Sequence, residues 1–513
     1  MKKILFLLLL VGFTLVGCSN PTTPNNPDDK PIYEPYVPTN TILSFSDENA
    51  NKVITEPTFD ISKYTADPGK NKIKPHDIFA SGMCLQRDAI NRIWGKASST
   101  KNIAIELKGE VYYGSVNGQD WEVYLPKMNA GGPYNLTIIS ELGRITLTDV
   151  YFGEVFYLGG QSNMEMSVAG CGDALKYLYI TQDCVNDKIR MLTVPWNLQD
   201  DPAVGALRNC KWKSADKNNI LTFSAVGYLF GRQMQEELDC PVGLIWSAVG
   251  GSNIESWLSD ENYSKIEEIY TPYKSGDPFM EPTVCYNGML YPLTGINVRG
   301  VLWYQGESNA FGTEQYYDQA LKIFIDQCRK MFNNQELAFI ICELARYEGL
   351  PFAYSVVNEK INTVAENDPY IVVARNLDQG DWFNIHPVNK KELGPRAAYE
   401  TLRVFFKFDK EEPVKITSYT FNDDGSVTIN LSKEIVKVNG TNGFEVYVNN
   451  SYTTQCNVTV TGSQLTITSS GEIEKVRYGY QCEMTSDIKS DVSKMVSIYD
   501  ENGFPLDLFL ITK

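Results

Sequence analysis

Three short segments of this chain carry the residue types of a serine hydrolase. Ser162 is a candidate nucleophile, His386 is a candidate base, and residues 305–309 (QGESN) add polar side chains between them in the sequence. A serine hydrolase needs a base that titrates near neutral pH, and histidine is the side chain that does so without perturbation. Because only two histidines occur in 513 residues, we predict that His386 is the base.

Ser162 lies at a turn that two glycines allow. The apolar run 155–158 predicts a strand, Gly159 and Gly160 follow it, and we expect a helix to begin soon after Ser162. Such a turn exposes the hydroxyl and directs backbone N–H groups at a developing oxyanion. Met164 stands where the G-x-S-x-G elbow has its last glycine, so this turn is of another kind. A purely structural turn is the alternative interpretation.

Two further strand ends carry groups suited to an active site, because sites in α/β sheets form beyond the carboxyl ends of the strands. The segment 248–253 (AVGGSN) follows an apolar run at 242–246, and its paired glycines let a backbone N–H serve an oxyanion hole. Gln305 and Glu307 follow the run 300–304. An amide and a carboxylate at a strand end favour a site role there, with surface solvation as the alternative.

A catalytic imidazole needs an acceptor on its second nitrogen to fix its tautomer. Asp381 is our first choice as the partner of His386, and Asp378 is the second. A Ser–His dyad oriented by a backbone carbonyl is the third. The other histidine, His76, lies in a strand-rich region beside Asp77, where a structural role is expected.

The N-terminus has the pattern of an export signal. A basic start (MKK) precedes an apolar run at residues 4–16, which is too short to span a bilayer. Residues 1–18 resemble a bacterial lipoprotein signal with Cys18 as the lipidated residue; an ordinary secretory signal with an incidental cysteine is the alternative. The Pro/Asn-rich stretch 19–41 predicts an extended tether. We expect a lipid-anchored protein of the bacterial cell envelope that faces the periplasm or the exterior.

Charge and cysteine content exclude several function classes. The formal net charge of −17 argues against nucleic acid or anionic lipid as a partner and favours a neutral substrate. Eleven cysteines without a C-x-x-C pair, together with two histidines, predict no metal site. We expect the cysteines other than Cys18 to be mostly buried free thiols, and a disulfide such as Cys171–Cys184 stays open in an exported protein. No obligate protein partner is indicated.

Hydrophobic periodicity divides the rest of the chain into three parts. Residues 42–147 contain short alternating strands and predict an N-terminal β domain. Residues 148–406 alternate compact apolar runs with helical patterns, which predicts a parallel sheet covered on both faces. Alternating strands return in residues 407–513 and predict a C-terminal β-sandwich. The clearest strand patterns are 103–107, 121–125, 155–158, 242–246, 300–304, 338–341, 370–374, 426–431 and 464–468.

Several motifs follow one another in an order that is typical of one family. The chain resembles the sialate O-acetylesterase-type proteins of the SGNH hydrolase superfamily. The matching stretches are 83–88 (MCLQRD), 93–97 (IWGKA), 160–165 (GQSNME), 224–228 (SAVGY), 241–245 (PVGLI), 286–289 (YNGM), 303–309 (WYQGESN), 386–387 (HP), 394–396 (GPR), 477–480 (RYGY) and 503–505 (GFP). The resemblance implies an α/β SGNH-hydrolase domain, flavodoxin-like with three layers and a parallel sheet, flanked by N-terminal and C-terminal β-sandwich domains.

The resemblance further implies a serine esterase that removes O-acetyl groups from sugars, with no metal or organic cofactor. Ser162 would attack the acetyl carbonyl, and His386 would take up and return the proton. The oxyanion would be held by the Ser162 N–H, by a glycine of the 250–251 pair (taken as Gly251) and by the Gln305 side chain. Glu307 would orient these groups or bind sugar hydroxyls.

The chain departs from the SGNH pattern at one position. That pattern places an aspartate three residues before the histidine, where this chain has Phe383. The departure favours the main alternative, a non-catalytic glycan-binding surface lipoprotein on an esterase scaffold; a lipid or thioester deacylase is the third hypothesis. 9-O-acetyl sialic acid and acetylated polysaccharide are both open as substrates, and Arg375 and Arg396 are candidates to hold a sialate carboxylate.

Overall fold

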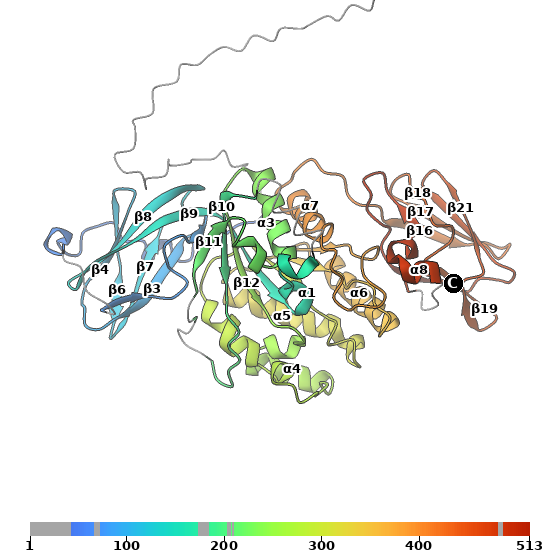
Figure 1. Cartoon of the computed structure of the whole chain (residues 1–513), viewed down its shortest axis with the longest axis horizontal. Coiled ribbons are helices and arrows are strands. Elements are labelled where there is room, and N and C mark those ends of the chain that lie inside the picture. The colour runs from blue at the N-terminus through green and yellow to red at the C-terminus, as the bar shows by residue number, and fades with distance from the viewer. Residues whose placement is uncertain (1–42, 66–71, 173–183, 203–206, 208–209, 481–485) are drawn as a thin grey trace, which may run out of the picture.

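A computed structural model of the chain describes residues 43–65, 72–172, 184–202, 207, 210–480 and 486–513. Cys18 and the predicted tether lie outside these residues. Figure 1 shows three parts in a row, with the N-terminal strands (blue) at one end, a helix-covered sheet in the middle and the C-terminal strands (red) at the other end. None of the described helices has the length and apolar character needed to cross a bilayer.

The N-terminal strands form two antiparallel groups. Strand β3 alternates buried and partly exposed side chains, as its period-2 sequence requires. One sheet has the order β1-β3-β7-β6, and in the other group β4 pairs with β5 and β8. The bounds are β1 (Ile73–Pro75), β2 (Cys84–Gln86), β3 (Asn91–Ala97), β4 (Ile103–Leu107), β5 (Glu110–Tyr113), β6 (Ser115–Asn117), β7 (Asp120–Leu125) and β8 (Gly131–Ser140).

Strand β9 (Gly143–Gly160) belongs to the N-terminal strands and to the central sheet at once. Its first residues pair antiparallel with β8, and its last residues pair in parallel with β12 and β13. From Val150 onward every residue of β9 is buried, as expected of a strand covered on both faces. The predicted domain boundary after residue 147 lies inside this strand, so the two sheets are continuous there.

The central sheet has the order β11-β10-β12-β9-β13-β14-β15. Six of these strands run parallel to one another, namely β10, β12, β9, β13, β14 and β15. Strand β11 pairs antiparallel with β10. The sheet is therefore mixed, which corrects the prediction of a parallel sheet at its β11 edge. The bounds are β10 (Asn186–Thr193), β11 (Trp212–Ala215), β12 (Val242–Ala248), β13 (Gly300–Tyr304), β14 (Ala338–Cys342) and β15 (Ile371–Ala374).

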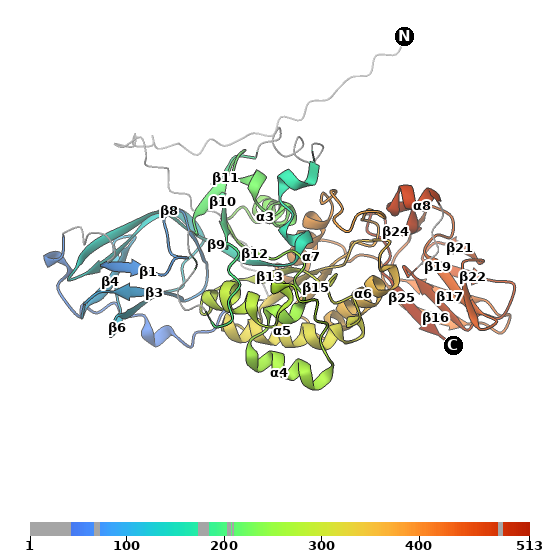
Figure 2. The ribbon, with the colours of Figure 1, turned by 60° about the horizontal axis from the view of Figure 1, so that its bottom comes forward.

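Helices cover both faces of this sheet (Figure 2). Helices α3 and α7 pack against each other on one face, and α5 and α6 pack against each other on the opposite face. The bounds are α1 (Ser162–Glu165), α3 (Ala225–Leu238), α4 (Asp260–Ile269), α5 (Tyr317–Met331), α6 (Pro351–Glu366), α7 (Leu393–Phe405) and α8 (Ser486–Ser490).

The order of the parallel strands marks the position of a site. Strand β9 comes first in the sequence and lies in the middle of the sheet. Strands β10 and β12 follow it in the sequence and lie on one side of it, and the later strands β13, β14 and β15 lie on the other side. Ligands in open α/β sheets bind at such a reversal, beyond the carboxyl ends of the strands. Ser162 follows the carboxyl end of β9 directly.

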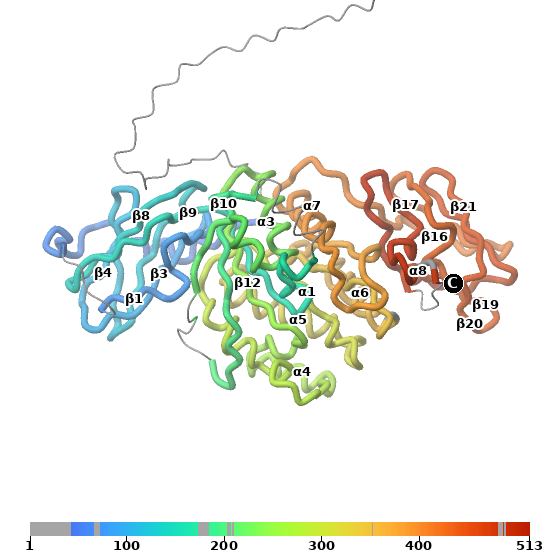
Figure 3. Tube along the Cα trace, in the orientation of Figure 1, coloured from blue at the N-terminus to red at the C-terminus, as the bar shows by residue number. Residues whose placement is uncertain are grey.

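The C-terminal strands form antiparallel sheets of order β16-β17-β22-β21 and β20-β19-β23-β25, with a small pair β18-β24. Val427 and Ile429 of one sheet share a buried cluster with Phe444 and Val446 of the other; their arrangement as a sandwich remains a prediction. Figure 3 traces α6 beside these strands. The bounds are β16 (Ile416–Phe421), β17 (Val427–Leu431), β18 (Val436–Lys437), β19 (Phe444–Val448), β20 (Ser451–Thr453), β21 (Asn457–Thr461), β22 (Gln464–Thr468), β23 (Lys475–Tyr478), β24 (Ile498–Tyr499) and β25 (Phe509–Thr512).

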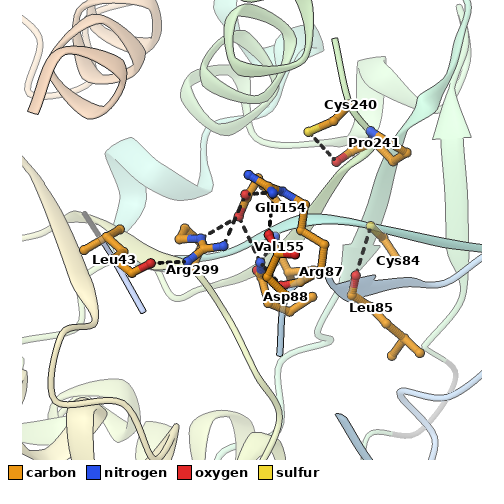
Figure 4. Close-up of polar contacts among 11 residues, drawn as sticks. Leu43, Cys84, Leu85, Arg87, Asp88, Glu154, Val155, Cys240, Pro241 and Arg299 are labelled. Atoms are coloured by element: carbon orange, nitrogen blue, oxygen red, sulfur yellow. Dashed lines mark hydrogen bonds and ion pairs between the residues drawn. The ribbon is translucent and has the colours of Figure 1, made fainter. Parts of the chain in front are cut away.

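A buried carboxylate joins the N-terminal strands to the central sheet (Figure 4). Glu154 on β9 has no exposed surface and forms ion pairs of 2.6 Å with both Arg87 and Arg299. Gln86 Nε2 donates to the same carboxylate at 2.9 Å, and Arg299 also donates to the Leu43 carbonyl at 3.2 Å. Burial alone would raise the pKa of Glu154, but the two guanidinium groups lower it to about 2. The charged cluster therefore fixes where β9 enters the central sheet.

The cysteines follow the prediction of free thiols within the described residues. All nine cysteines there are free, and eight of them are buried. Cys171 and Cys184 are both among the buried thiols, so the disulfide left open between them is not formed.

Candidate active site

The turn before Ser162 is pinned to the neighbouring strand. Gly160 has a φ of 141°, and a Cβ at this position would lie 2.0 Å from the Tyr304 carbonyl oxygen, so only glycine fits. The Gln161 N–H then donates to that same carbonyl at 3.0 Å. Ser162 begins α1 and is half-buried at the carboxyl end of β9.

Gln305 lies in a closed hydrogen-bond network. Its side chain is fully buried, and its Nε2 donates to Asn309 Oδ1 at 2.8 Å, Gln161 Oε1 at 3.2 Å and the Ser252 carbonyl at 3.3 Å. Its Oε1 accepts from Tyr317 at 2.9 Å. Since both amide hydrogens are engaged, Gln305 ties three strand-end loops together. Its predicted role as an oxyanion donor requires these bonds to open.

The glycine pair lies beside Ser162. A Cβ on Gly250 would be 3.6 Å from the Ser162 Cβ, so the two backbones approach closely. The Gly250 N–H donates to Glu165 Oε2 at 2.7 Å and is therefore occupied. Gly251 has a φ of 79°, and its N–H has no partner among the described residues. Of the two glycines, Gly251 is the one whose N–H carries no hydrogen bond among the described residues, and its role in an oxyanion hole stays a prediction.

Trp196 and Glu165 extend the site beyond the predicted residues. The Trp196 indole N–H donates to the Ala248 carbonyl at 3.1 Å, and the side chain is 52% exposed. Burial raises the pKa of Glu165, while the Gly250 N–H and the Trp196 indole oppose that shift. A lone tryptophan in a polar loop carries no periodic signal, so the sequence offered no reason to single it out.

His386 lies in a half-buried loop that local hydrogen bonds shape. Its backbone N–H donates to Asn384 Oδ1 at 2.9 Å, and the Phe383 N–H donates to Asp381 Oδ1 at 3.0 Å. Burial, and then the positive charge of Lys390, lower the pKa of the His386 imidazole. The imidazole is therefore neutral near pH 7, which is the state a general base requires.

The two candidate acids differ in their surroundings. Asp378 is buried and forms a bidentate pair with Arg396, with contacts of 2.6 and 2.8 Å. Asp381 is partly exposed and accepts only the backbone bond in its own loop. Among the described residues neither carboxylate bonds to the His386 ring. The Asp381 carboxylate therefore has fewer bonds to other groups than the Asp378 carboxylate. Its place in a catalytic triad stays a prediction.

The two arginines that were candidates to hold a sialate carboxylate both bond to other groups of the chain. Arg396 is held by Asp378, and Arg375 donates to the Pro505 carbonyl at 2.7 Å and lies 3.8 Å from Asp507. These contacts link the central sheet to the C-terminal strands.

Asn163 connects the turn that carries Ser162 to the loop that carries His386. Its Nδ2 donates to Glu307 Oε1 at 2.7 Å and to the Ile385 carbonyl at 3.1 Å, while its Oδ1 accepts from Lys390 Nζ at 2.5 Å. Ile385 directly precedes His386. Sequence reasoning missed Asn163 and Lys390, because an asparagine and a lysine in polar segments are usually solvent-exposed.

Glu307 lies beneath the site and not at its surface. The side chain is 1% exposed, Oε1 accepts from Asn163, and Oε2 has no partner among the described residues. Burial raises the pKa of this carboxyl. This burial favours the first of its two predicted roles, orienting neighbouring groups over binding sugar hydroxyls, and both roles stay predictions.

His76 occupies the structural position that was expected of it. The ring is buried among the N-terminal strands, with its centroid 5.2 Å from that of Trp94. Burial lowers its pKa to about 4.

Comparison with known proteins finds a family match in the central part of the chain. Residues 153–403 match the family model described as carbohydrate esterase, sialic acid-specific acetylesterase. The sialate O-acetylesterase of Homo sapiens is 30% identical over 276 residues, which are 49% of this chain and 52% of the human protein. That of Mus musculus is 31% identical over 253 residues, which are 42% and 46% of the two chains. The chain spans about half the length of these curated relatives.

One solved structure resembles nearly the whole described molecule. A carbohydrate acetylesterase from Xanthomonas citri superimposes with a TM-score of 0.77 at 24% identity, covering 86% of this chain and 100% of the other. At that identity the likeness shows the fold. Residues 153–403 are therefore similar to sialic acid-specific acetylesterases, which are carbohydrate esterases.

Proposed function

We propose that this chain is a carbohydrate O-acetylesterase that works through an acetyl-enzyme on Ser162. The observation that carries the proposal is the 3.1 Å hydrogen bond from Asn163 to the Ile385 carbonyl. This bond joins the residue after the candidate nucleophile to the residue before the candidate base. The family match of residues 153–403 supports the same class of ester.

In the proposed reaction the neutral His386 imidazole takes the proton of the Ser162 hydroxyl as Oγ attacks the acetyl carbonyl carbon. The N–H groups of Ser162 and Gly251 stabilise the oxyanion that forms. The C–O bond to the sugar then breaks, and His386 returns the proton to the departing sugar oxygen. Water attacks the acetyl-enzyme with the same base, and acetate leaves.

The imidazole also needs an acceptor on its second nitrogen. We assign this role to Asp381, whose carboxylate is partly exposed and bonded only within its own loop. Breaking its hydrogen bond with the Phe383 N–H would leave the carboxylate free to accept from the ring. A backbone carbonyl of the loop is the alternative acceptor.

The acetyl-enzyme provides the direct test of this function. The chain is mixed with a slow acetyl ester, quenched, digested and analysed by mass spectrometry. We expect one added acetyl group on the peptide that contains Ser162, together with a burst of alcohol release before steady turnover. Turnover without an acetylated Ser162 peptide, in a quench that traps acetyl-serine in a known serine esterase, would contradict the proposal.

We further propose that the preferred sugar is uncharged. A sialate carboxylate would need a cation, and binding at Arg375 or Arg396 would require breaking the contacts that engage them. The net charge of −17 also disfavours an anionic substrate. Acetate release is to be measured side by side from an O-acetylated neutral oligosaccharide and from O-acetylated sialic acid. Faster release from the neutral sugar is expected, and faster release from the sialate would overturn this preference.

A second candidate function is glycan binding without turnover. It is favoured by one observation, that neither candidate acid bonds to the His386 ring among the described residues. Binding of an acetylated oligosaccharide that is recovered with all of its acetyl groups would support it over the esterase.

We propose that the chain acts at the cell envelope, held by a lipid on Cys18. The apolar run that ends at this cysteine and the Pro/Asn-rich stretch behind it support the proposal. Cells that express the natural chain and its Cys18→Ala variant are fractionated into membrane and soluble material. We expect the natural chain in the membrane fraction and the variant outside it, and equal retention of both would rule out the anchor.

A further inference from the structure

Two opposite charges lie buried on either side of the Asn163 side chain. Lys390 is 2% exposed and Glu307 is 1% exposed, and both bond to the same amide. The ammonium group donates to Asn163 Oδ1 at 2.5 Å, and the carboxylate accepts from Asn163 Nδ2 at 2.7 Å. Hydrogen bonds to charged groups are about twice as strong as neutral ones, and a low local dielectric strengthens them further. The two charges therefore dictate which way the Asn163 amide points.

The same amide holds the base loop at two places. Asn163 Nδ2 donates to the carbonyl of Ile385, directly before His386. Lys390, four residues after His386, returns to Asn163 Oδ1. The loop segment that carries His386 is thus bracketed by two bonds to one side chain, and that side chain belongs to the residue next to Ser162.

We propose that Lys390 and Glu307 are positioning residues: a buried charge pair bridged by Asn163 that clamps the His386 loop onto the Ser162 turn. Neither side chain has to touch the substrate, because each acts through the orientation of the amide. The effect on turnover rests on the proposed esterase function, whereas the clamp and its effect on His386 do not.

Lys390 also acts on His386 electrostatically. The groups that face its ammonium come from several elements, namely Asn163 of α1, the Tyr304 ring of β13 at 5.5 Å, Glu307, Cys171, Cys342 of β14 and His386 itself. Burial lowers the pKa of Lys390 to about 8, against the opposing influence of Cys171 and Glu307, so the lysine is largely charged at neutral pH. Its positive charge disfavours a second positive charge on the imidazole, so the clamp also keeps His386 neutral.

The test uses the fact that the chain has only two histidines. Both imidazoles are titrated by NMR in the natural chain, in Lys390→Met and in a matched control, Lys391→Met, which changes the exposed neighbour. In Lys390→Met we expect the pKa of His386 to rise, because burial remains and the repelling charge is gone, while His76 stays unchanged as an internal reference. Unchanged His386 titration in Lys390→Met, or an equal rise in Lys391→Met, would overturn the proposal.

A double-mutant cycle tests the charge pair itself. Lys390→Met and Glu307→Gln each leave one buried charge without its partner, whereas the double variant leaves none. We expect each single variant to lower kcat by about 100-fold, the effect of a small misplacement of reacting groups, with little change in KM. The double variant should lose much less than the product of the two single losses. Multiplicative losses would contradict the pairing.

Two further measurements keep the result interpretable. If Lys390→Met does not fold, Asn163→Ala removes the bridge without removing either charge; it should show the same kcat loss and an altered His386 titration, and natural values of both would overturn the clamp. If no variant and not even the natural chain turns over an acetyl ester, the proposed function has failed. The NMR titration still decides whether the clamp exists.

Discussion

Asn163 donates a 3.1 Å hydrogen bond to the carbonyl of Ile385, across 222 positions of the sequence. One partner follows Ser162 and the other precedes His386, so this bond joins the turn that carries Ser162 to the loop that carries His386. The turn is held by β9 and β13 beneath it, through Gly160 and the Tyr304 carbonyl. Ser162 and His386 are thereby positioned by backbone and amide contacts that a substrate does not have to form.

The acid limb of the pH profile follows from His386. Burial and the charge of Lys390 lower the pKa of its imidazole below the ordinary value, and only the neutral form accepts the serine proton. We expect kcat/KM to rise as the pH increases through a pKa below 6.5, the ordinary value for histidine, and then to level off once the imidazole is neutral. Initial rates on an acetyl ester from pH 4 upward measure this, and a limb centred above 6.5 would contradict it.

The alkaline limb follows from Lys390. Its pKa is lowered to about 8 by burial, so above that pH the ammonium loses the charge that orients Asn163. Activity should therefore fall as the pH rises through about 8 in the natural chain. In Lys390→Met this particular limb should be absent, although the overall rate is lower. A limb of the same position in both proteins would assign it to another group.

Substitution of Asp381 should lower kcat, whereas substitution of Asp378 should lower the free energy of unfolding. Asp381→Asn is expected to lower kcat by about 10,000-fold through loss of the correct imidazole tautomer, with the free energy of unfolding unchanged because the side chain is partly exposed. Asp378→Asn leaves Arg396 buried without its counter-charge and should cost about 3–5 kcal/mol of stability. Steady-state kinetics and urea unfolding of both variants measure these effects. A larger kcat loss in a stably folded Asp378→Asn would reverse the assignment.

The carboxylate at the sheet junction should govern acid stability. The pKa of Glu154 is about 2 in the folded chain, below the ordinary value of about 4.3 for glutamate. Its stabilisation is therefore complete above the ordinary pKa and is lost as the pH falls toward 2. Glu154→Gln should lower the free energy of unfolding at pH 7 by about 3–5 kcal/mol, because two buried arginines lose their partner.

A matched control for that variant is Glu122→Gln. Glu122 pairs with Arg92 at 2.7 Å, but both side chains are partly exposed, so the expected cost is at most about 1 kcal/mol. Urea unfolding at pH 7 and at pH 4 distinguishes the two sites. Equal costs for the two variants would contradict the account of the buried cluster.

Strands whose sequence has one consistent pattern were predictable. The runs at 103–107, 300–304 and 464–468 become β4, β13 and β22 with the same bounds, because alternation or continuous apolarity directly reflects burial on one or both faces. Strand β9 was predicted only in part. Its first half alternates and its second half is wholly buried, so two patterns in one strand were interpreted as a domain boundary.

The residue types of the candidate site were predictable from the sequence, but the hydrogen bonds that connect them were not. Ser162, Gly251 and His386 follow strand ends or motifs that the sequence displays. Lys390 has no such signal, since its burial depends on neighbours from distant parts of the sequence, such as Asn163 and Tyr304. Hydrogen bonds to Asn309 and Gln161 likewise engage the Gln305 amide, and no spacing in the sequence indicates them.

The most direct test of the proposed activity is acetate release from a simple acetyl ester by the natural chain, by Ser162→Ala and by Ser264→Ala. The last variant removes an exposed hydroxyl on α4 and serves as the control. We predict release by the natural chain and by Ser264→Ala, and none by a Ser162→Ala protein that unfolds at the same temperature as the natural chain. Equal release by Ser162→Ala would show that Ser162 is not the nucleophile.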